Sequence, residues 1–155
     1  MDITVRPAEA AELDEIGELT AAAYLDAGLL SGGERNPYLQ RLRDARRRAE
    51  HAEVLAAVDT ASGRLLGAVA FVPDGGEFAD LAGPGEGEFR MLAVRAAARG
   101  RGAGEALVRA CLERARERGL HRMVLCSQQA MTAAHRLYAR LGFVRAPELD
   151  WQRSR

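Results

Sequence analysis

The segment EFRMLAVRAAARGRGAGEALVRACLERARERG, residues 88–119, combines the patterns of a strand, a glycine-rich turn and a helix. Residues 88–94 indicate a strand, and Arg99–Gly104 indicates a turn. A helix is expected from about Gly102 to Arg118, with Gly119 as its C-cap signal. Glycine lets the backbone come close to a ligand, and the N–H groups of a helix's first turn point outward. Together with the helix dipole, these N–H groups make an anion site, most naturally for a pyrophosphate.

The turn does not match the two best-known nucleotide-binding loops. A dinucleotide-binding GxGxxG that begins at Gly100 would need glycine where Glu105 stands, and a Walker A loop would need lysine followed by serine or threonine. All 22 basic residues are arginine, which also excludes Schiff-base lysine chemistry. Arg99 and Arg101 add charge-assisted donors to the anion site. The pattern that the turn does fit is [Gln/Arg]-x-x-Gly-x-[Gly/Ala], through Arg99, Gly102 and Gly104.

Outward from this segment, hydrophobic periodicity predicts a single α+β domain over residues 1–155. The order of elements is β-α-α-β-β-β-α-β-α(-β), an antiparallel start followed by a βαβ unit. Residues 73–87, rich in glycine, proline and acidic residues, are expected to form a surface loop. Strands are expected at residues 3–6, 53–58, 65–72, 88–94 and 121–127, helices at 10–24, 37–48, 102–118 and 132–141, and a last strand at 143–146 or nearer Trp151.

Composition and charge exclude several classes of protein. The chain has 155 residues, and its 22 basic and 22 acidic residues cancel, which gives no case for a nucleic-acid partner. The longest apolar stretch, Leu65–Val72, is far shorter than the roughly 20 residues of a membrane span, and the first residues lack an apolar signal core. We therefore expect a cytoplasmic protein. The two cysteines lack CxxC spacing and the three histidines lack ligand spacing, so no metal is expected.

Residues 88–119 resemble the coenzyme A signature of the GNAT superfamily of N-acetyltransferases. A second signature of that family follows at its usual distance, AHRLYARLGF at residues 134–143. The resemblance covers residues 88–143, and upstream only the order of elements agrees. It implies a GNAT-like fold, in which a central mixed and largely antiparallel sheet is flanked by helices. It also implies that acetyl-CoA, as the acyl donor, passes its acetyl group directly to a primary amine and leaves as coenzyme A.

In this family the turn wraps the pyrophosphate of coenzyme A with backbone N–H groups. The preceding strand splays from its parallel neighbour, here residues 121–127, so that its backbone binds the pantetheine arm as a further strand would. A strand N–H that matches Leu92 is implied to steady the oxyanion. The coenzyme-binding residues that the resemblance implies are Leu92, Ala93, Val94, Arg99, Gly100, Arg101, Gly102, Ala103 and Gly104.

Two side chains carry the implied proton transfers. Tyr138 matches the family tyrosine that faces the thioester sulfur, where a phenol that is protonated at neutral pH can donate to a departing thiolate. Its alternative role is that of a core aromatic. Glu88 stands where many members carry a general base that deprotonates the ammonium form of the acceptor. The alternative is a Glu88–Arg90 ion pair on one strand face, with Glu86 or a water as the base.

One position departs from the family pattern. Many members carry asparagine seven residues before the tyrosine, where this chain has Met131, and Ser127 or Gln128 could replace that coenzyme contact. A Cys126–His135 pair offers covalent acyl transfer as an alternative, but a small buried side chain is the more frequent role of such a cysteine.

Two further features favour structural interpretations. Cys111 lies on the apolar face of its helix and is expected in the core. The arginine-rich segment Arg41–Arg48 is interrupted by Asp44, which favours a solvated helix face over contact with an acidic partner.

The acceptor stays open among small amines, amino acids, antibiotics and protein N-termini, because kinship of fold does not fix it. Two rival functions stay open as well. One is a non-catalytic acyl-CoA-binding module, and the other is a transferase that uses a longer acyl group such as succinyl. Homodimer formation is also left open, whereas no nucleic-acid or membrane partner is expected.

Overall fold

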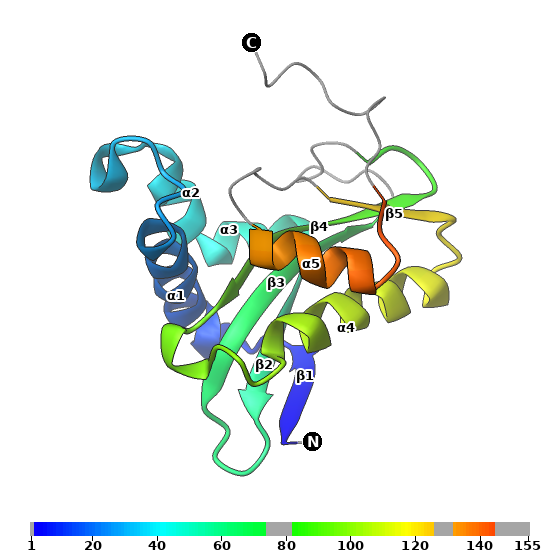
Figure 1. Ribbon diagram of the computed structural model, residues 1–155, viewed down its shortest axis with the longest axis horizontal. Helices are drawn as coiled ribbons and strands as arrows, with labels where there is room; N and C mark the ends of the chain where they lie inside the picture. The colour runs from blue at the N-terminus through cyan, green and yellow to red at the C-terminus, as the bar shows by residue number, and fades with distance from the viewer. Residues whose placement is uncertain (1, 74–81, 126–131, 145–155) are drawn as a thin grey trace. The chain divides into compact units, whose positions relative to one another are not determined.

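The computed structural model describes residues 2–73, 82–125 and 132–144 (Figure 1). Two compact units make up the chain, residues 1–125 and residues 126–155. The first unit contains a five-stranded sheet with its helices, and the described part of the second contains one α-helix. Within the described residues, no helix has both the length and the apolar character needed to cross a membrane.

The sheet is mixed and largely antiparallel, as the sequence predicts. Its strands are hydrogen-bonded in chain order, with antiparallel neighbours except for the last pair, which is parallel. The fourth strand begins at Glu86 rather than at Glu88, and the described part of the fifth ends at Val124. The strands are β1 (Ile3–Pro7), β2 (Glu53–Asp59), β3 (Leu65–Pro73), β4 (Glu86–Val94) and β5 (Arg122–Val124).

Helices cover both faces of this sheet (Figure 1). The first unit contains η1 (Ala10–Glu12), α1 (Leu13–Asp26), η2 (Gly33–Arg35), α2 (Tyr38–Arg43), α3 (Ala45–His51), η3 (Ala96–Ala98) and α4 (Ala103–Glu117). Val54, Ala56 and Val58 of β2 share one hydrophobic cluster with residues of α1 and α3. Residues of a strand alternate between faces, so Ala57 points to the opposite face of the sheet. Ala57 pairs with Gly67 of β3. A Cβ added at Gly67 would lie 3.4 Å from Leu107 of α4. The sheet is therefore packed between α1 and α3 on one face and α4 on the other.

The helix predicted at residues 37–48 is two helices, so that prediction was wrong in its continuity. Asp44 adopts φ −87° and ψ 66°, outside the helical region, and its carboxylate accepts a hydrogen bond from the Arg47 N–H at 3.1 Å. Aspartate is a favoured N-cap because its side chain satisfies an N–H of the first turn that has no helical partner. Asp44 therefore ends α2 and begins α3, and Pro37 precedes α2 as its N-cap.

The second unit contains α5 (Thr132–Arg140), which confirms the helix predicted there. The helix ends where Gly142 adopts φ 94°, and the Phe143 N–H donates to the Tyr138 C=O at 3.0 Å. This is the Schellman arrangement, in which glycine adopts the left-handed conformation after the last turn. Residues 143 and 144 form no strand, and the later positions considered for a last strand lie outside the described residues.

Candidate functional site

Parallel pairing between β4 and β5 is described for three residue pairs. Pairing runs from Glu86 with Arg122 to Glu88 with Val124, and β4 then continues to Val94 beyond the described part of β5. Leu92, predicted to bind the coenzyme, lies in this continuing part of the strand. The edge of β4 that faces away from β3 thus extends past the described part of β5. The splaying of the two strands that the family resemblance implies stays a prediction, because residues 126 and 127 lie outside the described residues.

A β-bulge lies in the same part of β4. Ala70 pairs with Arg90 and Ala68 with Ala93, so Val69 alone stands opposite the two residues between them. Met91 is the first of these two, and it adopts φ 56°, in the left-handed region that non-glycine residues rarely occupy.

The bulge changes which side chains share a face. Arg90 donates a hydrogen bond to the Tyr38 hydroxyl of α2, and Met91 is buried in a cluster with Leu39 and Leu42, also of α2. Two consecutive residues of β4 therefore both face α2, which a regular strand would not allow.

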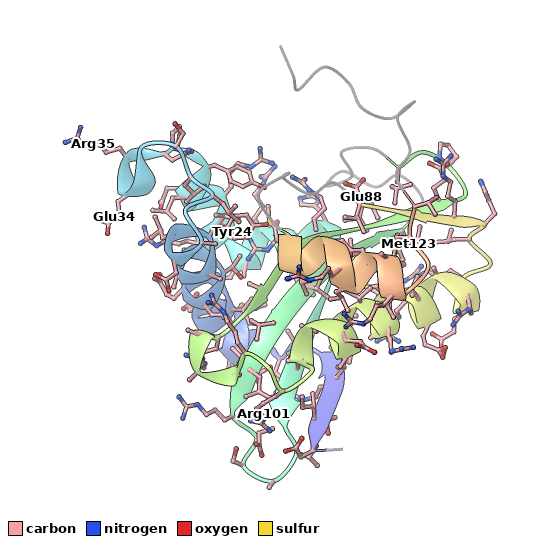
Figure 2. The ribbon with its side chains drawn as sticks, in the orientation of Figure 1. Tyr24, Glu34, Arg35, Glu88, Arg101 and Met123 are labelled. Carbon is pink, nitrogen blue, oxygen red and sulfur yellow. The ribbon has the colours of Figure 1, made fainter. Side chains whose placement is uncertain are left out.

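Glu88 is fully buried, and Figure 2 shows it on β4. Its Oε1 accepts a hydrogen bond from the Ala82 N–H at 3.0 Å. Glu86, the alternative base, accepts a hydrogen bond from the Gly83 N–H at 3.0 Å, and its second oxygen lies 3.5 Å from the Arg122 guanidinium. Both carboxylates lie on β4, and Glu88 is the one that is fully buried.

The predicted anion-binding turn has the backbone that the sequence suggests. Gly100 and Gly102 adopt φ 85° and 92°, and Gly102 is the N-cap of α4 without a side-chain cap. The first helical hydrogen bond runs from the Ala106 N–H to the Gly102 C=O at 3.0 Å, so the N–H groups of Ala103 and Gly104 precede the helical series. Both groups lie where the helix dipole favours an anion.

The two arginines of this turn have different roles. Arg101 donates to Asp2 at 2.9 Å and to Asp59 at 3.0 Å, and it lies at the β2–β3 hairpin (Figure 2). The hydrogen bond with Asp59 raises the pKa of Arg101. Its guanidinium is thus engaged with carboxylates, so any contribution of Arg101 to the anion site falls to its backbone N–H. Arg99 is exposed and forms no salt bridge within the part of the chain that the structure describes.

Tyr138 belongs to the second unit and is buried. Burial raises its pKa to about 12, so the phenol is protonated throughout the neutral range. Its ring meets that of Phe143 edge to face, with centroids 6.0 Å apart. This contact accompanies the Schellman motif and gives Tyr138 a packing role alongside any role in catalysis.

The cysteine and metal predictions are settled only in part. Cys111 is fully buried, and burial raises the pKa of its thiol to about 12, which confirms it as a core residue. Cys126, Ser127, Gln128 and Met131 lie outside the described residues, as does the side chain of His135. The described residues contain no group of three or more His, Cys, Asp and Glu side chains that could hold a metal ion.

The structure adds a cluster of arginines that the sequence analysis missed. Arg90 Nη2 donates to the Tyr38 hydroxyl at 3.3 Å, the Arg41 guanidinium lies 5.7 Å from the Tyr38 ring centroid, and Arg48 Nη1 donates to the Arg41 C=O at 2.7 Å. We call these four residues the Tyr38 cluster.

Arg48 is only 2% exposed, so the prediction of a solvated face over Arg41–Arg48 was wrong at this residue. A signal was present in the sequence. Leu39, Leu42, Ala45 and Arg48 recur every three residues, and the first three of them are buried. This spacing continues the apolar stripe to Arg48.

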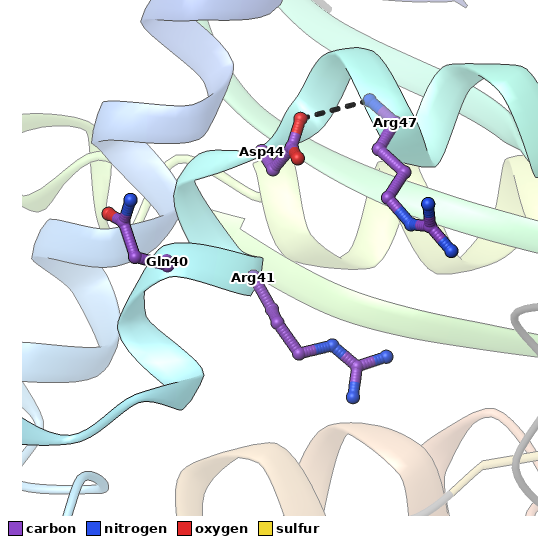
Figure 3. A pocket seen from close by; sticks show the side chains of 4 residues that line it. All are labelled: Gln40, Arg41, Asp44 and Arg47. Carbon is purple, nitrogen blue, oxygen red and sulfur yellow. Dashed lines mark hydrogen bonds between the residues drawn. The ribbon is translucent and has the colours of Figure 1, made fainter.

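A small open pocket lies at the junction of α2 and α3, lined by Gln40, Arg41, Asp44 and Arg47 (Figure 3). None of the predicted catalytic or coenzyme-binding residues lines it. Arg41 belongs both to this pocket and to the Tyr38 cluster.

Comparisons with known proteins find similar sequences and a matching family model. Residues 14–143 match the family model described as the Acetyltransferase (GNAT) family. Glucosamine 6-phosphate N-acetyltransferase 1 of Oryza sativa subsp. japonica is 40% identical over 91 residues, or 59% of this chain and 52% of that protein. The match thus spans about half the length of this curated relative.

Solved structures share the fold over nearly the whole chain. A GNAT family acetyltransferase from Brucella melitensis, in complex with acetyl-CoA, is 26% identical with a TM-score of 0.66, over 92% of this chain and 83% of that chain. A transcriptional regulator from Bacillus halodurans is 23% identical with a TM-score of 0.69, over 93% and 94% of the two chains. The second likeness shows the fold alone.

Proposed function

Since this chain belongs to the GNAT acetyltransferase family, whose members transfer acetyl groups from acetyl-CoA, we propose that it acetylates a primary amine by direct attack. The observation that carries the proposal is the bulge at Met91 in the part of β4 beyond the described part of β5, with the uncapped start of α4 on the same segment. Such an arrangement offers backbone N–H and C=O groups to one extended ligand.

The coenzyme fits the residues that are present. Its pyrophosphate would accept hydrogen bonds from the N–H groups of Arg99–Gly104, since Gly102 has no side-chain cap to compete for them. The exposed guanidinium of Arg99 would add a charge-assisted hydrogen bond. Leu92, Ala93 and Val94 would bind the pantetheine arm through their backbone, in the manner of an added strand.

Glu88 would act as the general base. A primary amine is an ammonium ion at neutral pH and must lose a proton before its nitrogen can attack. In the proposed reaction that proton passes to the Glu88 carboxylate, either directly or through a water. Its other oxygen is oriented by the hydrogen bond from the Ala82 N–H.

Tyr138 would complete the proton balance. The C–N bond forms as the C–S bond breaks, the phenol donates its proton to the departing sulfur, and the surplus proton of the new amide nitrogen returns through solvent to the phenolate. Its raised pKa keeps the proton on the phenol until it is needed. The carbonyl oxygen gains negative charge during attack, and the N–H of Leu92, beside the bulge, is the proposed donor to it.

The experiment measures release of coenzyme A from acetyl-CoA across a panel of amines, with the product identified by mass spectrometry. Glucosamine 6-phosphate belongs in the panel because the rice relative is named for it. We expect acceptor-dependent release and an N-acetyl product. Tight coenzyme binding without release by any amine would favour the non-catalytic module, and faster transfer from succinyl-CoA would favour the longer acyl group.

Direct attack is tested separately from activity. Enzyme incubated with acetyl-CoA and no acceptor should show no mass increase of one acetyl group on the intact chain. An acetyl adduct on the chain that persists without acceptor and disappears when an amine is added would contradict direct transfer. It would point to a covalent intermediate.

A further inference from the structure

The Tyr38 cluster concentrates positive charge beside the proposed catalytic strand. Its arginines come from three elements: Arg41 from α2, Arg48 from α3 and Arg90 from β4. The apolar cluster of Leu39, Leu42 and Met91, with Tyr24 and Tyr38 packed against it, fixes α2 against β4. Arg48 is buried, Tyr38 and Arg90 are half-buried and Arg41 is exposed, so the cluster extends from the core to the surface.

Arg48 is the most informative member of the Tyr38 cluster. Its Nη2 is buried and has no hydrogen-bond partner among the residues that the structure describes. Burial lowers the pKa of Arg48, and the charge of Arg90 lowers it further, whereas Tyr38, Tyr24 and Asp44 raise it. A guanidinium nevertheless keeps its charge in proteins. Leaving such a buried charged donor unsatisfied is costly, and an anion with several acceptor oxygens would remove that cost.

Two carboxylates of the first unit accept hydrogen bonds from backbone groups. Asp44 accepts from the Arg47 N–H at 3.1 Å, and Glu88 accepts from the Ala82 N–H at 3.0 Å. Three guanidinium groups, those of Arg41, Arg48 and Arg90, lie around Tyr38. Guanidinium groups gathered in this way favour an anionic ligand.

The position of Arg90 relates this charge to the proposed base. Glu88 and Arg90 pair with Val72 and Ala70 of β3, and because they are two residues apart they point to the same face of β4. A strand rises by about 3.3 Å per residue, so the two side chains leave the strand about 7 Å apart. A single small molecule can span that separation.

We propose that the acceptor carries an anionic group, a carboxylate or a phosphate, which Arg48 and Arg90 bind beside Tyr38 while its amine lies at Glu88. This inference rests on the proposed function and deepens it by naming the class of acceptor: an amine joined to an anion by a short spacer. The other role open to Arg48 is purely structural, because its bond to the Arg41 C=O satisfies the end of α2.

The first test measures anion binding without any need for turnover. Calorimetry follows inorganic phosphate, and in a second arm acetate, binding to the full chain saturated with coenzyme A. We expect one of the two anions to bind and thereby to distinguish phosphate from carboxylate. Arg90→Gln should weaken that binding at least tenfold. Arg46→Gln is the matched control, because Arg46 is an exposed arginine of α3 that pairs with Asp14, and it should change binding less than twofold.

A second variant separates a ligand role from a structural one. Arg48→Gln removes the buried charge, and its folding is checked by its melting temperature. A folded Arg48→Gln that binds the anion at least tenfold more weakly supports the proposal. Unchanged anion binding in Arg90→Gln, or no binding of either anion to the wild type, overturns it. If coenzyme A itself does not bind, the proposed function is wrong. Anion binding is then measured on the protein without coenzyme A.

Turnover gives an independent readout. Acceptors are compared in pairs that differ in the anionic group, 4-aminobutyrate with 4-aminobutyramide and glucosamine 6-phosphate with glucosamine. We expect at least a tenfold higher kcat/KM for an anionic member, a preference that Arg90→Gln abolishes while the KM for acetyl-CoA changes less than twofold. Equal use of both members of each pair, or a preference that survives in Arg90→Gln, contradicts the proposal.

Discussion

Glu88 combines complete burial with a backbone hydrogen bond from the Ala82 N–H to its Oε1. Glu88→Gln keeps an oxygen for the Ala82 N–H but removes the ability to take a proton. We expect kcat/KM to fall most at low pH, where free amine is scarce, by up to about 10²–10⁴-fold. The loss should shrink as the pH approaches the pKa of the acceptor, because solution then supplies the neutral amine. The pH–rate profile of the variant measures this.

Glu86→Gln is the matched control for that experiment. Glu86 lies two residues earlier on β4 and contacts Arg122, so its loss should leave the shape of the profile unchanged. If the Glu88→Gln profile instead runs parallel to wild type from about pH 6 to about pH 9, the base is not Glu88. A changed profile in Glu86→Gln alone would assign the role to Glu86.

Tyr138 has both a hydroxyl and a packing surface, and Tyr138→Phe separates them. The substitution keeps the edge-to-face contact with Phe143, so the melting temperature and coenzyme affinity should stay close to wild type. kcat should fall by roughly 10²-fold or more if the phenol protonates the leaving sulfur. Turnover within a factor of two of wild type, under conditions where chemistry limits the rate, would leave Tyr138 with packing alone.

The raised pKa of Tyr138 sets the sign of one pH effect. Burial favours the neutral phenol and moves its pKa from 10 to about 12. Loss of the proton therefore begins to lower kcat only above about pH 11. A wild-type kcat that declines near pH 10, with the protein still folded, would contradict a buried phenol as the acid.

At the scale of elements, the contact between α1 and α2 holds Tyr38 in place. A Cβ added at Gly17 of α1 would lie 2.0 Å from the Arg43 C=O of α2. Alanine normally stabilises a helix by about 1 kcal/mol relative to glycine. Here we expect Gly17→Ala to destabilise the protein by at least about 1–3 kcal/mol, because backbone atoms must move apart.

Chemical denaturation of Gly17→Ala measures that free energy of unfolding. Ala22→Gly, at an exposed position of the same helix, serves as the control and should cost only the ordinary propensity of about 1 kcal/mol. A Gly17→Ala variant more stable than wild type would show that α1 and α2 are not in close contact.

Much of the element pattern could be predicted from the sequence, because hydrophobic periodicity and glycine stops are local signals. The break at Asp44 could have been predicted too, since aspartate is a favoured N-cap. The bulge at Met91 could not, because it depends on the register with β3, and methionine gives no signal for a positive φ. A register is fixed by contacts between strands, which no single segment records.

For the first unit as a whole, the predicted part of the site lies within one segment, whereas the missed part depends on contacts between distant segments. Glu88 and the Arg99–Gly104 turn lie on one contiguous segment, so the sequence could indicate them together. Tyr38 stands 52 residues before Arg90, its hydrogen-bond partner. Only the packing of α2 onto β4 brings those two residues together. The burial of Arg48 was missed because a charged side chain was expected to face solvent, although Arg48 continues the buried stripe of α2 and α3.

Coenzyme A is proposed to bind at the start of α4, and calorimetry of two aspartate variants tests this directly. Gly102→Asp sets a negative side chain at the N-cap, where the pyrophosphate is proposed to bind. Gly119→Asp is its control, because Gly119 follows the other end of α4 and has nothing within 4 Å of an added Cβ. Both glycines have a positive φ, 92° at Gly102 and 71° at Gly119.

We predict that wild type binds one coenzyme A per chain, that Gly119→Asp binds it within twofold of wild type, and that folded Gly102→Asp binds at least tenfold more weakly, a loss of about 1.4 kcal/mol. Equal affinity of Gly102→Asp and wild type would contradict the central assignment.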